Sequence, residues 1–307
     1  MNNRIRVLNF DDSVTKQIKL LEKYDAEVID FKRLAGSARF WINKKTKKEI
    51  TLRTSSSSKN SVTFLGSGDF HHISSILIKE FTEPVTVINF DFHPDWCVFP
   101  PWLSCGSWVA ETLKSANVAK VVLLGMGSRE ASSFSVQAGD YAELQNNRIE
   151  IYPWAQKPST AFFRNIPKNK SMITEKRGIF TKIYWNELKD KNLTEFLHSI
   201  IMSFPTKRVY ISIDKDCLEK QVSLTNWEDG GLSLENLLLM LKIIKQETDI
   251  VGVNVTGDYS KVFIRGIIKK VISHLDHPKN FSAKAVSEAD ITRINENTNM
   301  EIMKILA

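Results

Sequence analysis

The chain has 307 residues, of which 42% are hydrophobic and 25% are charged, so it can bury a sizeable core and has the composition of a soluble globular protein. No apolar run approaches the roughly 20 residues that a membrane-spanning helix needs, and we expect no secretory signal at the amino terminus. Three cysteines without a CxxC motif argue against a disulfide scaffold and favour a reducing cytoplasm.

The net charge of +7 comes from 42 basic and 35 acidic residues. Lysines cluster at positions 44–48 and again, with Arg177, at positions 168–177. Such clusters are usually solvated, but they can also attract an acidic partner such as a peptide or a nucleic acid. Because no motif of a nucleic-acid-binding fold accompanies the charge, we expect a peptide rather than a nucleic acid as partner.

Residues 1–60 are predicted to form short strands and one helix over Ser13–Lys23, and to end in a flexible polar loop at 54–60. From residue 61 onward, strand-like and helix-like patterns alternate, which predicts a mostly parallel sheet covered by helices on both faces. The predicted strands are Val62–Leu65, Val85–Phe90, Lys120–Leu124, Ile179–Tyr184, Arg208–Ile213 and Ile250–Val255, and the predicted helices are Ile73–Phe81, Ser107–Ala116, Leu188–Met202, Ser233–Gln246 and Lys261–His274.

The remaining segments are less regular. Residues 153–177 are rich in Pro, Lys and Ser and are predicted to form a long irregular excursion. The tail at 276–307 is expected to contain a terminal helix. We therefore expect one domain over 1–307, with 61–275 as its core, 1–60 as N-terminal strands and helix, and 276–307 as a C-terminal tail.

The strand Val85–Phe90 runs into an Asp-x-His-x-Asp alternation formed by Asp91, His93 and Asp95. Alternation along a strand would place these three side chains on one side, and Pro94 would end the strand there. Two carboxylates and an imidazole at a buried rim need a compensating cation, which predicts a metal site. The alternative is a polar strand end exposed to solvent.

Two other predicted strands end in similar residues. Val62–Leu65 leads into Gly66-Ser67-Gly68-Asp69-Phe70-His71-His72, and Arg208–Ile213 runs into Asp214-Lys215-Asp216. Ligands of open α/β sheets bind at the carboxyl ends of the strands. Two imidazoles and four carboxylates suit a pair of divalent ions such as Mn²⁺ better than a structural zinc. Such a pair would lower the pKa of a bridging water towards about 7. The candidate ligands are His71, Asp91, His93, Asp95, Asp214 and Asp216.

The order of these motifs, followed by a Gly-Gly-Leu-Ser helix start at 230–233, resembles the arginase or ureohydrolase superfamily over roughly residues 61–260. The resemblance implies a three-layer α/β/α fold with a central mostly parallel sheet, two Mn²⁺ ions and hydrolysis of guanidino or related C–N bonds. It implies that the six residues above are ligands, with Asp91 and Asp216 bridging. His71 fits the family register, so His72 is expected either to lie behind the ligands or to face the substrate. The proton for the leaving amine is expected from His72 or from a relayed water.

Several positions depart from the family pattern. Cys105-Gly106 stands where the family has His-Gly, and Cys105 is expected to be a small neighbour of the site rather than a nucleophile. Free-arginine enzymes have Glu-Val-Asn where this chain has Gly252-Val253-Asn254. Asp258, at the exit of the same strand, is a substitute carboxylate or alternatively the N-cap of the next helix.

The loop Thr225–Gly231 replaces the glycine-rich substrate loop of the family. Trp227 could stack on a guanidinium or serve in packing. Asn226 and Asp229 are candidate substrate contacts. Glu228 and Asp229 offer further negative charge, with a solvated turn as the alternative. Ser233 is expected to cap the following helix.

These departures resemble a branch that includes peptide arginases, which convert arginine side chains within a peptide to ornithine. The leading hypothesis is therefore a dinuclear metal-dependent hydrolase of peptidyl arginine that releases urea, with an arginine-containing peptide as partner. The alternatives are hydrolysis of another C–N bond in a small guanidine, formimino or acyl-amine compound, and a non-catalytic metal-binding interaction module. An oligomer is compatible with the sequence.

Overall fold

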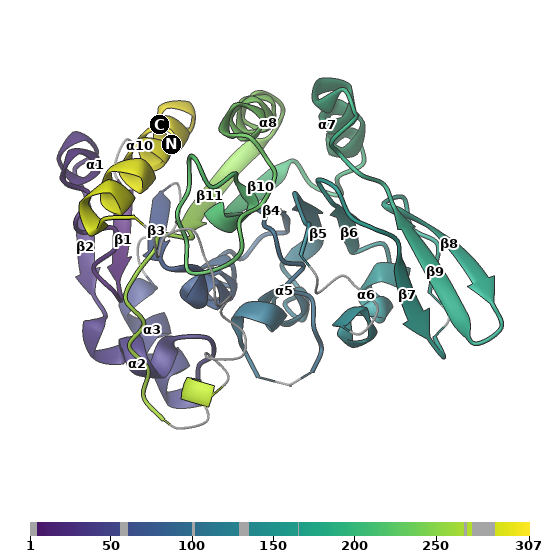
Figure 1. The fold of residues 1–307 in the computed structure, drawn as a ribbon, viewed down its shortest axis with the longest axis horizontal. Coiled ribbons are helices and arrows are strands. Elements are labelled where there is room, and N and C mark those ends of the chain that lie inside the picture. The colour runs from purple at the N-terminus through teal and green to yellow at the C-terminus, as the bar shows by residue number, and fades with distance from the viewer. Residues whose placement is uncertain are drawn as a thin grey trace.

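A parallel sheet of eight strands, in the order β2-β1-β3-β11-β10-β4-β5-β6, forms the centre of the molecule (Figure 1). The computed structural model describes residues 5–55, 61–99, 102–128, 135–164, 166–266, 269–271 and 286–307. In sheet order the strands are β2 Glu27–Asp30, β1 Ile5–Asn9, β3 Val62–Gly66, β11 Asp249–Thr256, β10 Arg208–Asp214, β4 Val85–Phe90, β5 Val118–Leu124 and β6 Ile149–Tyr152.

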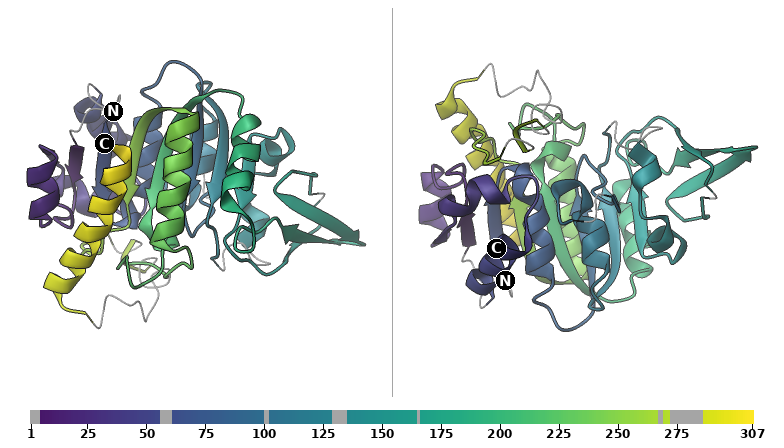
Figure 2. Two further views of the ribbon diagram at one scale, coloured as in Figure 1. Left: turned by 90° about the horizontal axis from the view of Figure 1, so that it is seen from above. Right: turned by 90° about the horizontal axis from the view of Figure 1, so that it is seen from below.

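Helices cover both faces of the sheet, as predicted from the alternation of strands and helices (Figures 1 and 2). In the central strand β4, Val87 belongs to the hydrophobic core on one side, and Ile88 and Phe90 belong to the core on the other. This period of two is what a strand buried on both faces requires. One face carries α1 Ile18–Lys23, α7 Leu193–Met202, α8 Leu234–Glu247 and α10 Glu288–Leu306, and the other carries α2 Ala35–Ala38, α3 Lys44–Thr54, α4 Ser74–Ile78, α5 Trp108–Leu113 and α6 Tyr141–Gln145.

Five of the six predicted strands lie in this sheet, and the sixth does not. The strand predicted at Ile179–Tyr184 is β9 (Phe180–Trp185), which pairs antiparallel with β7 (Ser159–Phe162) and β8 (Met172–Arg177) in a separate three-stranded sheet. We call β7, β8 and β9 the β-arm. A connection of only two residues joins β8 to β9, which fits an antiparallel hairpin but is too short for a parallel crossover. The prediction that 153–177 is irregular is therefore wrong for the two strands β7 and β8.

The prediction of helices was correct for the terminal helix α10 and for α8, whose N-cap Ser233 accepts a hydrogen bond from the backbone of Asn236. The predicted set missed α3, which is rich in lysine and is capped by Asn43. The helix predicted over Lys261–His274 is not formed at residues 261–266, and most of the rest lies outside the described residues, as do positions 56–60 of the predicted flexible loop. No helix in the described part of the chain is long and apolar enough to cross a membrane.

A buried ion pair joins the neighbouring strands β5 and β6. Lys120 Nζ lies 2.6 Å from Glu150 Oε1, and both side chains are less than a tenth exposed. The hydroxyl of Tyr152 donates to the other oxygen of Glu150 at 3.1 Å. Because each charge would be costly to bury alone, removing only one of the two partners should destabilise the fold more than removing both.

We expect Lys120→Met to lower the free energy of unfolding by about 3–5 kcal/mol, because it leaves the Glu150 carboxylate buried without its cation. The double variant Lys120→Met with Glu150→Met should recover most of the loss. Urea unfolding followed by circular dichroism measures both, with the exposed Lys48→Met on α3 as control. A loss for Lys120→Met no larger than for the control would contradict this interpretation.

Candidate metal centre

The six candidate ligands converge at the carboxyl edge of the central sheet. His71 lies in the short helix Gly68–Ile73 that follows β3, and the Asp91–Asp95 turn follows β4. Asp214 is the last residue of β10, and Asp216 lies in the next turn. Because β3, β10 and β4 are parallel strands of one sheet, their exits meet at one edge. All six residues are buried.

Five of the six candidate ligands form two triads that share Asp91, and Asp95 lies beside the first triad. His71, Asp91 and Asp214 offer one ligand atom each within 4.8 Å of one another, and Asp91, His93 and Asp216 do the same. The Nδ1 atom of His71 lies 3.2 Å from Asp91, 3.3 Å from Asp95 and 3.4 Å from Asp214. The Nδ1 atom of His93 lies 2.8 Å from Asp216. Each triad thus combines one imidazole with two carboxylates, and Asp91 is placed to serve both. Asp216, which was also expected to bridge, belongs to one triad only.

The turn after β4 does not continue the strand. The strand ends at Phe90, and Asp95 has a φ of 46°, in the left-handed region that non-glycine residues rarely adopt. The backbone N–H of His93 donates to Asp91 at 2.7 Å and closes the turn. Asp95 therefore reaches the site through a strained turn, and not through the alternation of side chains along a strand that the sequence predicted.

Neighbouring groups orient the ligands. The Nε2 atom of His71 lies 2.7 Å from the hydroxyl of Ser212, which leaves Nδ1 facing the carboxylates. The indole N–H of Trp108 donates to Asp95 at 2.7 Å. Such partners fix the ring orientation and carboxylate position of metal ligands. Sequence reasoning missed both, although Ser212 precedes Asp214 by two residues and therefore shares its face of β10.

Crowding changes the proton affinity of the carboxylates. Burial, followed by the charge of Asp216, raises the pKa of Asp214 well above its ordinary value. Burial and the charge of Asp91 raise the pKa of Asp95 to about 8. For His71, burial lowers the pKa, but hydrogen bonds with Asp91 and Asp95 outweigh it and hold the pKa well above 6.5. The cluster therefore needs positive charge, and its oxygen-rich donor set fits a pair of divalent cations.

A slot of about 30 Å³ opens over these residues. A Cβ at Gly68 would come within 2.8 Å of Asp214 and 3.2 Å of Trp227, so glycine is required at this position. Trp227 forms one wall, and its indole N–H donates to Asp69 at 3.0 Å. The slot is lined by Gly68, His71, Asp91, His93, Asp95, Cys105, Gly106, Asp214, Asp216 and Trp227.

Two residues expected to act on the substrate lie elsewhere. His72 is fully buried, does not line the slot, and has a pKa lowered to about 3 by burial and by Lys269, so the structure does not place the expected proton donor at the site. Asp258 is also buried and forms an ion pair with Lys215 at 2.9 Å while accepting from Gln17 at 2.7 Å. Neither the substrate-binding nor the N-cap prediction for Asp258 matches this arrangement.

The loop Thr225–Gly231 contributes in different ways along its length. Asn226 is buried and anchors the loop by donating to the carbonyl of Ser260 at 2.8 Å, so it does not face the slot. Glu228 Oε2 lies 3.3 Å from the outer nitrogen of His93. Asp229 lines an adjacent open cavity of about 530 Å³ together with Phe92, Trp154 and Lys189, among others. Of the predicted substrate contacts, Trp227 and Cys105 line the slot itself.

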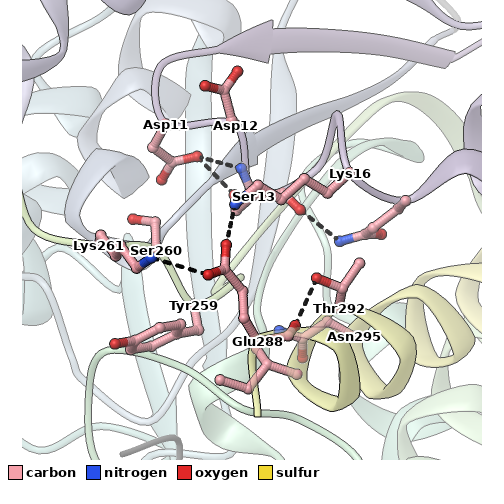
Figure 3. A pocket seen from close by; sticks show the side chains of 12 residues that line it. Asp11, Asp12, Ser13, Lys16, Tyr259, Ser260, Lys261, Glu288, Thr292 and Asn295 are labelled. Atoms are coloured by element: carbon pink, nitrogen blue, oxygen red, sulfur yellow. Dashed lines mark hydrogen bonds and ion pairs between the residues drawn. The ribbon is translucent and has the colours of Figure 1, made fainter.

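A separate cavity of about 230 Å³ lies where the loop after β1 faces the first turns of α10 (Figure 3). Glu288 forms ion pairs there with Lys16 and with Lys261. Asp11, on its wall, accepts from the backbone of Ser67 at 3.1 Å, next to the turn that carries His71. The cavity shares no lining residue with the slot over the candidate ligands.

Comparison with known proteins supports the fold and the family. Residues 163–260 match the sequence model of the Arginase family. A protein of Thermotoga maritima, described as uncharacterized, is 26% identical over 197 residues, which cover 64% of this chain and 58% of that protein. The chain therefore aligns with somewhat more than half the length of this relative.

Solved structures share the fold over almost the whole chain. Arginase from Bacillus subtilis has a TM-score of 0.58 at 11% identity, covering 98% of both chains. Formimidoylglutamase from Bacillus subtilis has a TM-score of 0.57 at 13% identity, covering 98% of this chain and 85% of the other. The match of residues 163–260 to the Arginase family and the shared fold agree with the resemblance of the sequence motifs to the arginase/ureohydrolase superfamily.

Proposed function

We propose that this protein is a dinuclear metal-dependent hydrolase that converts arginine residues within a peptide to ornithine and releases urea. The observation that carries the proposal is the pair of buried triads that share Asp91. Carboxylate-rich donor sets of this kind suit manganese, which we propose as the metal. The three cysteines are all free, which supports a reducing cytoplasm as the location.

The reaction adds one water to the guanidinium, breaks the bond between its carbon and the side-chain nitrogen, and yields urea and an ammonium group. The leaving nitrogen thus gains both protons of the water. Two divalent ions in the site would supply Lewis acidity to this water and to the developing charge. His71, His93 and the four aspartates would hold the ions, with Ser212 and Trp108 maintaining the orientation of His71 and Asp95.

The walls of the slot support a guanidinium as the reacting group. Trp227 offers an aromatic surface for a planar cation, and its ring is held by the hydrogen bond to Asp69. Glu228, beside His93, is half-exposed at the entrance and adds negative charge there. A cationic, flat head group therefore fits the slot better than an acyl-amine does.

The surroundings support a residue within a peptide over free arginine. The described residues that line the slot include no lysine or arginine to bind an α-carboxylate. Asp258, the expected substitute carboxylate, is already neutralised by Lys215 and does not offer its charge to a substrate. The slot is also small, so the chain that carries the guanidinium must lie outside it, where the larger cavity beside Phe92 and Trp154 is open.

We expect the manganese-loaded protein to lower the mass of arginine-containing peptides by about 42 Da per arginine converted, the mass lost when hydrolysis releases urea. Mass spectrometry of a varied peptide set measures this, with free arginine, a formimino compound and an acetyl-lysine peptide in parallel. If one of these three compounds is hydrolysed and the arginine peptides are unchanged, that compound class is the substrate and the peptide proposal is wrong. If no compound is hydrolysed, the result favours a non-catalytic metal-binding module.

Metal content should follow the two triads. We expect Asp91→Asn to lose both ions because Asp91 belongs to both groups, whereas Asp216→Asn should lose chiefly the ion of its own triad. Elemental analysis after gel filtration measures the manganese per chain. The exposed Asp190→Asn serves as control. An Asp91→Asn protein that keeps two ions would show that Asp91 is not shared.

Asp258→Asn should act on stability and not on substrate binding. Removing this carboxylate leaves the buried Lys215 ammonium without its partner, at a cost of about 3–5 kcal/mol in the free energy of unfolding. We expect the KM for an arginine peptide to change less than about twofold, because uniform substrate binding is unaffected. Urea unfolding and steady-state kinetics distinguish the two effects; a raised KM with unchanged stability would restore the substrate-binding role.

A further inference from the structure

The β-arm carries most of the net charge of the chain. Residues 157–187 contain seven basic and two acidic residues, a net charge of +5, whereas the whole chain of 307 residues has +7. The arm projects from the β6 side of the molecule (Figures 1 and 2). A concentrated positive field on a projecting element attracts acidic partners at long range.

The two faces of the β-arm differ. Ala161, Ile183 and Trp185 point to one face and are buried in the main core. The opposite face presents Ile173, which is 72% exposed, and Phe180, which is 43% exposed. Lys182 and Arg177 lie on this same outer face, because Lys182 alternates with Ile183 along β9 and Arg177 pairs with Phe180. Glu175 lies on this face too, opposite Lys182 in register and 3.5 Å from Arg177. The outer face is therefore apolar and carries two basic side chains around one carboxylate.

The β-arm also has an open edge. β8 pairs with β9, and with no other strand among the described residues. Figure 1 shows β8 at the outer margin of the arm. Because a strand paired on one side leaves every second N–H and C=O group pointing outward, this edge can accept a further strand. The exposed side chains of Lys176 and Arg177 stand at the end of β8.

The charge of the β-arm and the packing of its aromatic rings indicate which kind of partner can bind its outer face and open edge. A second copy of the chain would bring one strongly positive arm against another, which is repulsive. A nucleic acid would need open aromatic faces for stacking. However, Phe162 and Phe180 pack edge to face with their centroids 5.4 Å apart, and Lys182 lies 5.1 Å from the centre of the Tyr184 ring. These rings are therefore already packed against other side chains of the arm, which disfavours stacking on nucleobases.

We propose that the β-arm binds an extended acidic peptide segment that adds as a strand to the edge of β8, with its acidic side chains over Arg177 and Lys182. The backbone ladder would supply affinity, and the charges would supply selectivity for acidic sequences. This binding does not depend on the hydrolysis proposed above, because the arm lies apart from the residues that line the slot.

Fluorescence anisotropy with the full chain tests the proposal. The probe is a labelled peptide of about eight residues in which glutamate alternates with valine, so that a strand presents all glutamates on one face. We expect saturable binding that weakens with salt and falls by about tenfold in the double variant Arg177→Glu with Lys182→Glu. Ile173→Glu should also weaken it, because Ile173 borders the same edge.

Matched controls separate a specific site from general attraction. Lys44→Glu with Lys48→Glu changes the net charge by the same amount at the other lysine cluster, on α3, and should leave binding within about twofold. A peptide with two valines replaced by proline, which lacks the N–H groups for a ladder, should bind weakly. Equal losses in both double variants, full binding of the proline peptide, or tighter binding of a short oligouridine would each overturn the proposal. Thermal unfolding of each variant verifies that the fold is retained.

Discussion

Electrostatic repulsion among buried carboxylates is the constraint on which the functional edge of this protein depends. Asp91, Asp95, Asp214 and Asp216 are at most 5% exposed and crowd around two imidazoles. Burial raises the pKa of Asp214, Asp95 and Asp216, so the cluster as it stands favours protonated or cation-bound oxygens over free anions. Divalent ions bound at this edge would supply the positive charge that protons otherwise supply. The fold holds the donor atoms in place for such ions.

The surrounding structure supports the cluster through groups that do not face the slot. Arg39 forms a buried ion pair with Asp69, and Asp69 in turn accepts the indole hydrogen bond of Trp227. Arg39 also donates to Ser260, whose carbonyl holds Asn226. One network thus connects the turn that carries His71 with the loop that forms a wall of the slot. Close backbone approach adds to it, because a Cβ at Gly230 would come within 2.0 Å of the Cys217 carbonyl oxygen.

Two ion pairs between secondary-structure elements show how the same fold treats charges that serve structure. Lys120 with Glu150 and Lys215 with Asp258 are each buried and paired one to one, so each charge is compensated within the protein. The metal centre differs because its acidic residues outnumber the basic groups that face them. That imbalance, rather than burial or hydrogen bonding, is what distinguishes a candidate site from a structural ion pair in this chain.

Local pattern determined much of the architecture. Runs of β-branched and apolar residues located five strands of the central sheet, and the polar residues directly after Phe90 and Ile213 marked the edge where ligands gather. Such features are readable because period and strand exit are properties of short segments. The antiparallel pairing of the β-arm escaped this reasoning, because an isolated apolar run does not specify its partner strand or its direction.

Long-range contacts decided the rest. Asp258 follows a strand of the sheet and looked like a substrate ligand, yet Lys215, 43 positions away in sequence, neutralises it. His72 is adjacent to a candidate ligand but is fully buried and does not line the slot, while Ser212 and Trp108, with no motif of their own, orient the candidate ligands. The amino-acid sequence therefore determined which residues are candidates for the site, and only the tertiary structure decided which of them face the slot, because partners far apart in sequence set the charge and orientation of each.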